Sequence, residues 1–420
     1  MKAPTGKFTS DLAWNAASFA LSAVFGILLN VVILRVYDAT ALGVFNLVYA
    51  VYILLSQLAV GGVHLAVQAF VPRELFHGRR ADPFITAAML LSMLTSVLVM
   101  AAAWWGRSLP GLWFESPMVS EAFPLVIWGL LFFSWNKVLL SFHNGARRMR
   151  LFAVFQLLRA VLLFAGLLAM VYSEAGPARL PQLLAWTELG LFILLLPVSL
   201  RSWSPGRQGL KDAIGESFRF GNRALTGNFL LDINTRVDVF LLGILLNERA
   251  VGLYSFASTV AEGAMQLPVL FRNNLNPVIS KAWNQGGPAL LGKVMSRSRK
   301  AAFKLLALAF GASILLFPVA LRVVGMADEP MLVWMVYAAL AGGGLLVAGR
   351  LPFMMLFSQL GYPGWQTLFI TCGFLFNVAL NLVLIPLLGV VGAGLATGLA
   401  TVATMLLHRW MAFRIAKVRF

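Results

Sequence analysis

"ALGVFNLVYAVYILLSQLAV", residues 41–60, is matched without a gap by "AVGLYSFASTVAEGAMQLPV", residues 250–269. Gly43 coincides with Gly252, Gln57 with Gln266, and the aromatic Phe45 with Tyr254. Each stretch is about long enough to cross a hydrocarbon core of about 30 Å. Two copies of one apolar segment, one in each half of the chain, predict a duplicated bundle of membrane helices.

The whole chain has the composition of a membrane protein. Of its 420 residues, 60% are hydrophobic and 12% are charged, against about 25% charged in a typical soluble domain. We expect the first apolar run to be an uncleaved span rather than a signal peptide. Cys372 is the only cysteine, which excludes an intrachain disulfide and a multi-cysteine metal site. The predicted spans are Leu12–Val36, Val44–Phe70, Phe84–Trp105, Phe123–Phe142, Leu151–Tyr172, Leu180–Leu200, Phe220–Leu246, Val251–Ile279, Ala302–Val324, Met331–Phe357, Trp365–Leu388 and Val390–Ile415.

The net charge of +17 is explained by where the basic residues lie. They gather in alternate connections, which predicts that those connections and both termini are cytoplasmic. The charge is thus an orientation signal, and we expect no nucleic-acid partner. The opposite side has only Arg35, Arg107, Arg179, Arg249 and Arg322. The cytoplasmic set is Lys2, Lys7, Arg73, Arg79, Arg80, Arg147, Arg148, Arg150, Arg201, Arg207, Lys211, Arg219, Lys281, Lys293, Arg297, Arg299, Lys300, Lys304, Arg409, Arg414, Lys417 and Arg419.

The repeat sets the predicted architecture. Both copies lie in the second helix of their half and run in the same direction, from outside to inside. This predicts an all-α membrane protein of about twelve helices in two six-helix lobes around a central cleft. The N-lobe covers residues 1–200, a cytoplasmic linker covers residues 201–219, and the C-lobe covers residues 220–420.

Three stretches resemble a known family. "RVDVFLLGILLNERAVGLYSFASTV" (236–260) is similar to the signature at helices 7 and 8 of polysaccharide exporters of the multidrug/oligosaccharidyl-lipid/polysaccharide (MOP) superfamily. "FNVALNLVLIPLLGVVGAGLATGLATV" (376–402) resembles that family's helix 11–12 junction, and "YDATALGVFNLVYAV" (37–51) its helix 1–2 turn. The lipid II flippases of the superfamily usually have two more helices, so the chain departs from that branch.

The resemblance implies a function as well as a fold. It implies an O-antigen-type (Wzx-like) flippase of the bacterial cytoplasmic (inner) membrane, which moves a polyprenyl-diphosphate-linked saccharide outward by alternating access. Such a protein is not an enzyme and needs no cofactor. It would serve lipopolysaccharide synthesis, and its partners would be membrane lipids, a polysaccharide polymerase and glycosyltransferases.

Five basic side chains inside the predicted spans form the candidate site for the lipid diphosphate. All five fall in the cytoplasmic half of their helices, and they come from both lobes. Arg is suited to phosphate because its forked donors match the phosphate oxygens. The alternative is that these side chains extend along the helices to the cytoplasmic headgroups. The five residues are Lys137, Arg159, Arg223, Arg272 and Arg350.

Acidic side chains near the predicted midplane form a second candidate set. Charged groups at this depth are costly, so we expect them to face a cavity or to pair. Glu188, Asp232 and Glu262 are candidates for coupling transport to H⁺ or Na⁺. The alternative is a salt bridge between Asp232 and Arg236, which are spaced i,i+4.

Other polar residues in the C-lobe have weaker functional interpretations. Asp238, in the signature-like stretch, is interpreted as structural. Asn377 and Asn381 are candidates for contact with sugar hydroxyls, and the alternative is that they bond helices together.

Two other functions remain open. A drug-exporting (MATE-like) relative would carry cationic substrates and favours an acidic cavity, whereas the spans hold more bases than acids. A membrane-embedded polymerase or glycosyltransferase needs a sizeable external loop with catalytic residues. The longest external connection, about residues 106–122, is short and has no acid–base pair that favours an enzyme.

Overall fold

A computed structural model describes residues 5–206, 208–325 and 329–418, except for the side chains of residues 5–13 and 226–232. The described residues form α-helices and 3₁₀ helices, and none of them is in a strand. The chain divides into two compact units, Met1–Ile233 and Asn234–Phe420. The division falls inside the helix expected to open the second lobe, after the predicted linker. The lobe boundaries therefore stay a prediction.

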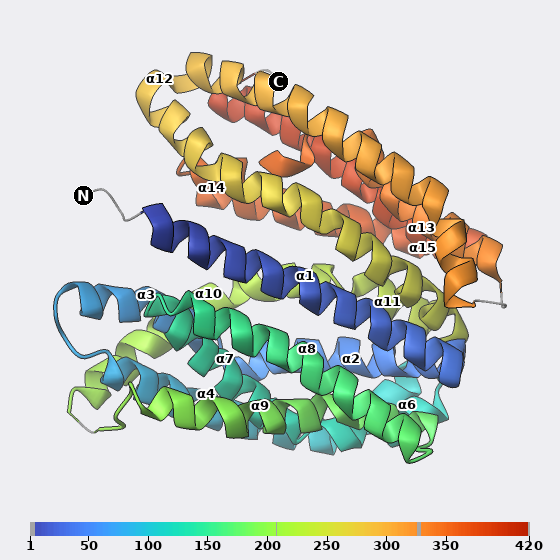
Figure 1. Cartoon of the computed structure of the whole chain (residues 1–420), viewed down its shortest axis with the longest axis horizontal. Coiled ribbons are helices and arrows are strands. Elements are labelled where there is room, and N and C mark those ends of the chain that lie inside the picture. Colours follow the sequence, from blue (N-terminus) through green and yellow to red (C-terminus); the bar gives the residue numbers. More distant parts are fainter. Residues whose placement is uncertain (1–4, 207, 326–328, 419–420) are drawn as a thin grey trace. The chain divides into compact units, whose positions relative to one another are not determined.

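Unit 1 is a bundle of long helices that run side by side (Figure 1). α1 lies along α8, and α7 packs against both α9 and α4. The elements of the unit are α1 (Thr5–Val36), α2 (Ala39–Val60), α3 (Val63–Phe76), α4 (Asp82–Trp105), α5 (Leu109–Trp113), α6 (Pro117–Ala122), η1 (Phe123–Val126), α7 (Gly129–Gly145), α8 (Met149–Tyr172), η2 (Pro177–Gln182), α9 (Leu183–Leu200) and α10 (Leu210–Asn234).

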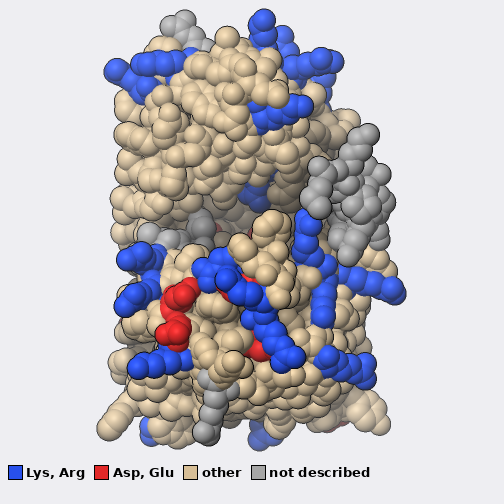
Figure 2. Space-filling model, turned by 90° about the vertical axis from the view of Figure 1, so that its left-hand side faces the viewer, with Lys and Arg blue, Asp and Glu red and all other residues tan. Residues whose placement is uncertain are grey.

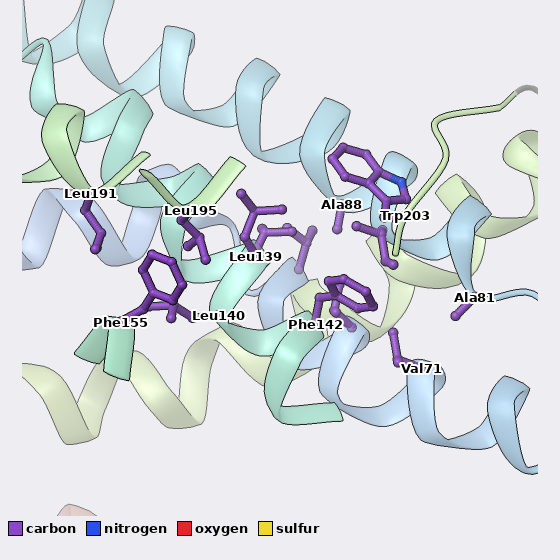
Figure 3. Packing of buried hydrophobic residues seen from close by; sticks show 14 residues of the cluster. Val71, Ala81, Ala88, Leu139, Leu140, Phe142, Phe155, Leu191, Leu195 and Trp203 are labelled. Carbon is purple, nitrogen blue, oxygen red and sulfur yellow. The ribbon is translucent and has the colours of Figure 1, made fainter. Parts of the chain in front are cut away.

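A cluster of buried apolar side chains packs the helices of unit 1 together (Figure 3). α7 is central to it, with Leu139 and Phe142 packed among side chains from α3, α4, α8 and α9. Trp203, just after α9, closes the cluster and donates its indole N–H to the Thr86 hydroxyl at 3.0 Å. This packing fixes the face of α7 that carries the polar residues described below.

A salt bridge from Arg73 and the close approach of Gly221 to Gly62 fasten α10 to α3. Arg73 bridges Glu74 at 2.9 Å and Glu216 of α10 at 3.1 Å, and Arg79 bridges Glu74 at 2.6 Å. Burial raises the pKa of Glu74, but Arg79 and Arg73 outweigh that effect and leave the pKa below its ordinary value of 4.5. The Arg73–Glu216 contact therefore ties α10 to the end of α3.

Unit 2 consists of α11 (Val237–Leu245), α12 (Glu248–Val324), α13 (Pro330–Leu346), η3 (Leu351–Phe353), α14 (Leu356–Gln359) and α15 (Pro363–Ala416). α12 has 77 residues, which would extend for about 115 Å if it were straight. It is broken at Gly287 and α15 is broken at Gly389, each with φ in the left-handed region, at 55° and 60°. Each of these elements therefore consists of two helices.

The helices are those of a multi-pass membrane protein. Seven of the described helices are long and apolar enough to cross a membrane, or eight if the pair from Pro117 to Gly145, bent by 52°, counts as one span. Large apolar side chains on them are exposed, among them Leu308 (71%) and Leu315 (78%), as expected for surfaces that face lipid. The number of twelve spans and the side of the termini stay predictions.

Besides the predicted span over Phe123–Phe142, which bends between η1 and α7, three predicted spans are interrupted in the structure. The predicted helix over Val44–Phe70 breaks at Gly61 and Gly62, which both have positive φ. The helix over Phe220–Leu246 breaks at Thr235 and Arg236, between α10 and α11. The helix over Met331–Phe357 ends at Leu346, and a turn and the short helices η3 and α14 follow.

Candidate functional site

The most buried ionic contact of unit 1 joins α8 to α9. Arg159 Nε lies 3.0 Å from Glu188 Oε1, and Nη2 donates to Oε2 at 3.1 Å. Asn136 on α7 donates to the same Oε2 and to the Glu188 carbonyl oxygen, both at 2.8 Å. Glu188 is 4% exposed. The sequence proposed phosphate binding for Arg159 and ion coupling for Glu188, and the structure pairs the two groups with each other.

Lys137 lies beside this ion pair. Its ammonium group donates to Gln57 Oε1 of α2 and lies 5.7 Å from the centre of the Phe133 ring. The Arg159 guanidinium lies 5.3 Å from the same ring. A cation over an aromatic face is attracted by the ring quadrupole. Phe133 therefore links the two cations into one site inside unit 1.

A cavity of about 270 Å³ between α1 and α8 reaches the same site. Arg159, Gln156 and Ser22 supply its polar groups, and most of the remaining wall is apolar, including Phe19 and Phe25. One face of the guanidinium group thus borders an open space while its nitrogens contact Glu188. The cavity has the mixed lining typical of a site for an amphiphilic molecule.

In unit 2, Arg236 is bonded differently from the sequence-based alternative. Its Nη1 lies 3.8 Å from Glu262 Oε1 of α12, and the Glu262 side chain is 53% exposed. The i,i+4 pairing with Asp232 assumed one continuous helix, and the break at Thr235–Arg236 removes that continuity. The Asp232 side chain lies outside the described residues, so its coupling role stays a prediction.

Asp238 is the buried carboxylate of unit 2, at 8% exposure. Its Oδ2 accepts hydrogen bonds from the Tyr254 hydroxyl of α12 and, at 3.2 Å, from the Thr397 hydroxyl of α15. Its Oδ1 is buried without a hydrogen-bond partner among the described residues. The two hydroxyl contacts are consistent with the structural interpretation, which stays a prediction, and the buried Oδ1 is an acceptor that this interpretation does not use. Tyr254 was already marked in the sequence, because it is the aromatic position of the repeat.

Asn377 and Asn381 lie together on α15, and both are buried. Asn381 Nδ2 donates to the Asn377 carbonyl oxygen at 2.9 Å and to the Asn377 side-chain oxygen. Both bonds are within one helix, and Asn381 Oδ1 has no partner among the described residues. Contact with sugar stays a prediction.

The five predicted phosphate-binding cations fall into both units. Lys137, Arg159 and Arg223 belong to unit 1, where Arg223 is exposed on α10, and Arg272 and Arg350 belong to unit 2, where both are half-buried. Only Lys137 and Arg159 are brought into one cluster. Arg350 is not on a regular helix, since it immediately precedes η3.

Arg350 lines a cavity of about 480 Å³ together with Arg299, Lys300 and Lys304 of α12. These three residues were counted in the sequence only as an orientation signal. A stronger signal was present, because the chain has no Asp or Glu from residue 263 to 327 or from 330 to 420. Among the described residues, none of the four cations has an ion-pair partner.

A family model agrees with this fold and these motifs. The model, described as polysaccharide biosynthesis protein, matches residues 8–283. The chain belongs to this family. The match includes the stretch 236–260 on which the resemblance was based, and no curated protein matches the sequence.

Solved structures similar to this polysaccharide biosynthesis protein are transporters. The lipid II flippase MurJ, in an inward closed conformation, has a TM-score of 0.75 at 13% identity, over 95% of this chain and 87% of that one. An inward-facing multidrug resistance MATE family transporter of the MOP superfamily has a TM-score of 0.73 at 14% identity, over 94% and 95%. A MOP superfamily transporter from Pyrococcus furiosus has a TM-score of 0.56 at 13% identity, over 96% and 95%. At these identities the likeness shows the fold alone.

Proposed function

We propose that this protein is a flippase that carries a polyprenyl-diphosphate-linked saccharide from the inner to the outer leaflet of a bacterial inner membrane by alternating access. The family match over residues 8–283 is the observation that carries the proposal. The solved flippase with the same fold is described as acting on lipid II, which is consistent with a lipid-linked saccharide as substrate. O-antigen synthesis, with a polymerase and glycosyltransferases as partners, is the setting that fits this substrate.

The charges of the described residues favour an anionic substrate. The intramembrane acids Glu188 and Glu262 each contact an Arg, and Asp238 accepts bonds from two hydroxyls. Arg272 and Arg350 have no acidic partner among the described residues. A drug exporter for cations would need acids that are free to meet the substrate, so this balance favours a diphosphate.

The second candidate function is a MATE-like exporter coupled to H⁺ or Na⁺. The fold supports it as well as it supports a flippase, since a MATE transporter superposes at a TM-score of 0.73. Asp238 is the described carboxylate best placed for coupling, because it is buried and keeps one oxygen without a hydrogen bond. Coupling through Glu188, Glu262 or Asp232 remains part of this proposal.

A transport assay in proteoliposomes separates the two functions. We expect a fluorescent polyprenyl-diphosphate saccharide to cross the membrane only in vesicles that contain the protein. We expect ethidium, a cationic dye, to be retained equally with and without the protein under a pH or Na⁺ gradient. Gradient-driven dye export without movement of the lipid-linked saccharide would establish the second function instead.

A further inference from the structure

The cavity formed by Arg299, Lys300, Lys304 and Arg350 is a site in unit 2 that transport of a saccharide does not by itself explain. We call it the α12–α13 pocket. Unit 2 is rich in basic residues, and Figure 2 shows several Lys and Arg side chains in the upper part of the picture. Among the residues coloured there, no acidic side chain is visible beside them.

The pocket concentrates positive charge without neutralising it. Arg350 interacts electrostatically with Arg299 and with Arg409, both of which repel it. Its Nε is buried without a hydrogen-bond partner among the described residues. Arg299 and Arg350 are half-buried, and Lys300 and Lys304 are exposed at the edge of the pocket. Crowding partly buried cations is unfavourable unless an anion joins them. Since unit 2 has no acid from residue 263 to 327 or from 330 to 420, that anion comes from outside these segments.

The local backbone keeps the cations close. Gly349 packs against α12 so tightly that a Cβ there would lie 3.0 Å from the Arg299 carbonyl oxygen and 3.1 Å from Phe303 Cβ. This contact holds the residue next to it, Arg350, beside the first turns of the membrane-spanning part of α12. The arrangement is therefore built into the packing of α13 on α12.

The depth and lining of the pocket indicate the kind of anion. Arg299 and Lys300 precede the predicted span Ala302–Val324, and Lys304 is in its first turn, which is the level of the cytoplasmic headgroups. The rim is apolar and exposed, with Phe303 at 49% and Leu346 at 70%. A molecule that matches both features has a phosphate head and a hydrocarbon chain.

We propose that the α12–α13 pocket binds the phosphate headgroup of a lipid in the cytoplasmic leaflet, with the chain of that lipid lying along Phe303 and Leu346. The phosphate belongs either to an anionic phospholipid or to a polyprenyl diphosphate. The chemistry of recognition is the same for both, and the site is independent of whether the protein is a flippase or a drug exporter.

Native mass spectrometry of the full chain in detergent tests the site. The probes are phosphatidylglycerol and undecaprenyl diphosphate. Phosphatidylcholine is the control lipid, because its phosphate is balanced by a cation in the same headgroup. We expect one saturable equivalent of each of the first two lipids. The double variant Arg299→Gln/Arg350→Gln should bind at least about tenfold more weakly, and Lys300→Gln/Lys304→Gln should weaken binding in the same direction.

The matched control is Lys293→Gln/Arg297→Gln, which removes two cations from α12 outside the pocket. Variants are compared only where gel filtration and thermal unfolding match the wild type, and Arg350→Lys, which keeps the charge, serves where Arg350→Gln does not fold. The proposal would be overturned if the control variant lost as much lipid binding as the pocket variants, or if both pocket variants bound the lipids as the wild type does. Phosphatidylcholine binding as tight as that of the anionic lipids would also overturn it. When the two anionic lipids compete for the pocket, the one that binds more tightly is identified as the source of the phosphate. If the lipids bind to the pocket but the saccharide is not transported, the flippase function is rejected and the lipid-binding proposal stands.

Discussion

Arg159 and Glu188 form a two-point ion pair across α8 and α9, with contacts of 3.0 and 3.1 Å, and Asn136 completes the coordination of the carboxylate. Glu188 is buried and Arg159 is 27% exposed on its side chain. A buried pair of this kind contributes little net stability, but removal of one partner leaves an uncompensated charge. The pair must therefore be tested as a unit.

Arg159→Ala should abolish export while the protein still inserts, and should lower the free energy of unfolding by about 3 kcal/mol because Glu188 loses its counter-charge. Thermal unfolding in detergent and saccharide transport in proteoliposomes measure the two effects. The double variant Arg159→Gln/Glu188→Gln removes both charges. If it restores stability but not export, the charges of the pair act in transport itself. If it restores both, the pair is structural, and the phosphate-binding role of Arg159 is rejected.

Asp238→Asn should abolish the dependence of transport on a pH or Na⁺ gradient, because the amide cannot ionise, while Tyr254 and Thr397 can still donate to its oxygen. Tyr254→Phe is the control, since it removes one hydroxyl and leaves the carboxylate. Asp232→Asn in the same assay separates the two candidate carboxylates. Gradient dependence that persists in Asp238→Asn and vanishes in Asp232→Asn would assign coupling to Asp232.

Glu74 should stabilise the contact between α3 and α10 in a pH-dependent way. Its pKa is below 4.5 in the folded protein, so its contribution is fully present above its unfolded pKa and is lost as the pH falls through the folded value. Glu74→Gln should lower stability by about 1–2 kcal/mol at pH 7. The difference in thermal unfolding from the wild type should shrink as the pH drops below about 4.5. A difference that is the same at pH 7 and pH 3 would contradict the role of its ionisation.

Gly62→Ala should disrupt unit 1 far more than Gly78→Ala. Both glycines have positive φ, 69° and 68°, so each substitution costs about 1 kcal/mol in backbone strain. Only at Gly62 would the new Cβ also collide with backbone, 2.4 Å from the Gly221 carbonyl oxygen, whereas Gly78 has no neighbour within 4 Å. Yield and thermal unfolding of the two variants compare the cost of the collision with that of strain alone. Equal losses in both would mean that α3 and α10 can separate at little cost.

The sequence predicted helices and membrane character because these depend on local hydrophobicity. The breaks were harder to foresee. The break at Gly61–Gly62 lies where Gly221 of α10 approaches closely, which a single sequence does not reveal. Thr235–Arg236 carries no Gly or Pro to mark an interruption. Membrane depth could be inferred by counting residues, but rotation of each helix could not.

The rotation of each helix about its axis decides which charged side chains contact each other in the site. Glu188 and Arg159 were assigned separate roles because nothing in their spacing shows that α8 and α9 turn the two side chains toward each other. The Arg236–Glu262 contact follows in the same way from the break before α11 and its packing on α12. Conversely, the sequence itself shows that no acidic residue is near Arg350 along the chain. Only the cavity in the structure shows which basic residues lie beside Arg350.

The contrast between the two ionic arrangements determines how the membrane potential acts on the protein. A voltage does work only on net charge that moves through the field, at about 2.3 kcal/mol per 100 mV for one charge that crosses completely. The Arg159–Glu188 pair is neutral as a unit, so its movement is insensitive to voltage. Arg350 carries a full charge without an acidic partner among the described residues. An inside-negative potential therefore pulls this side chain toward the cytoplasm to the extent that it moves through the field, and an anion bound beside it reduces that pull.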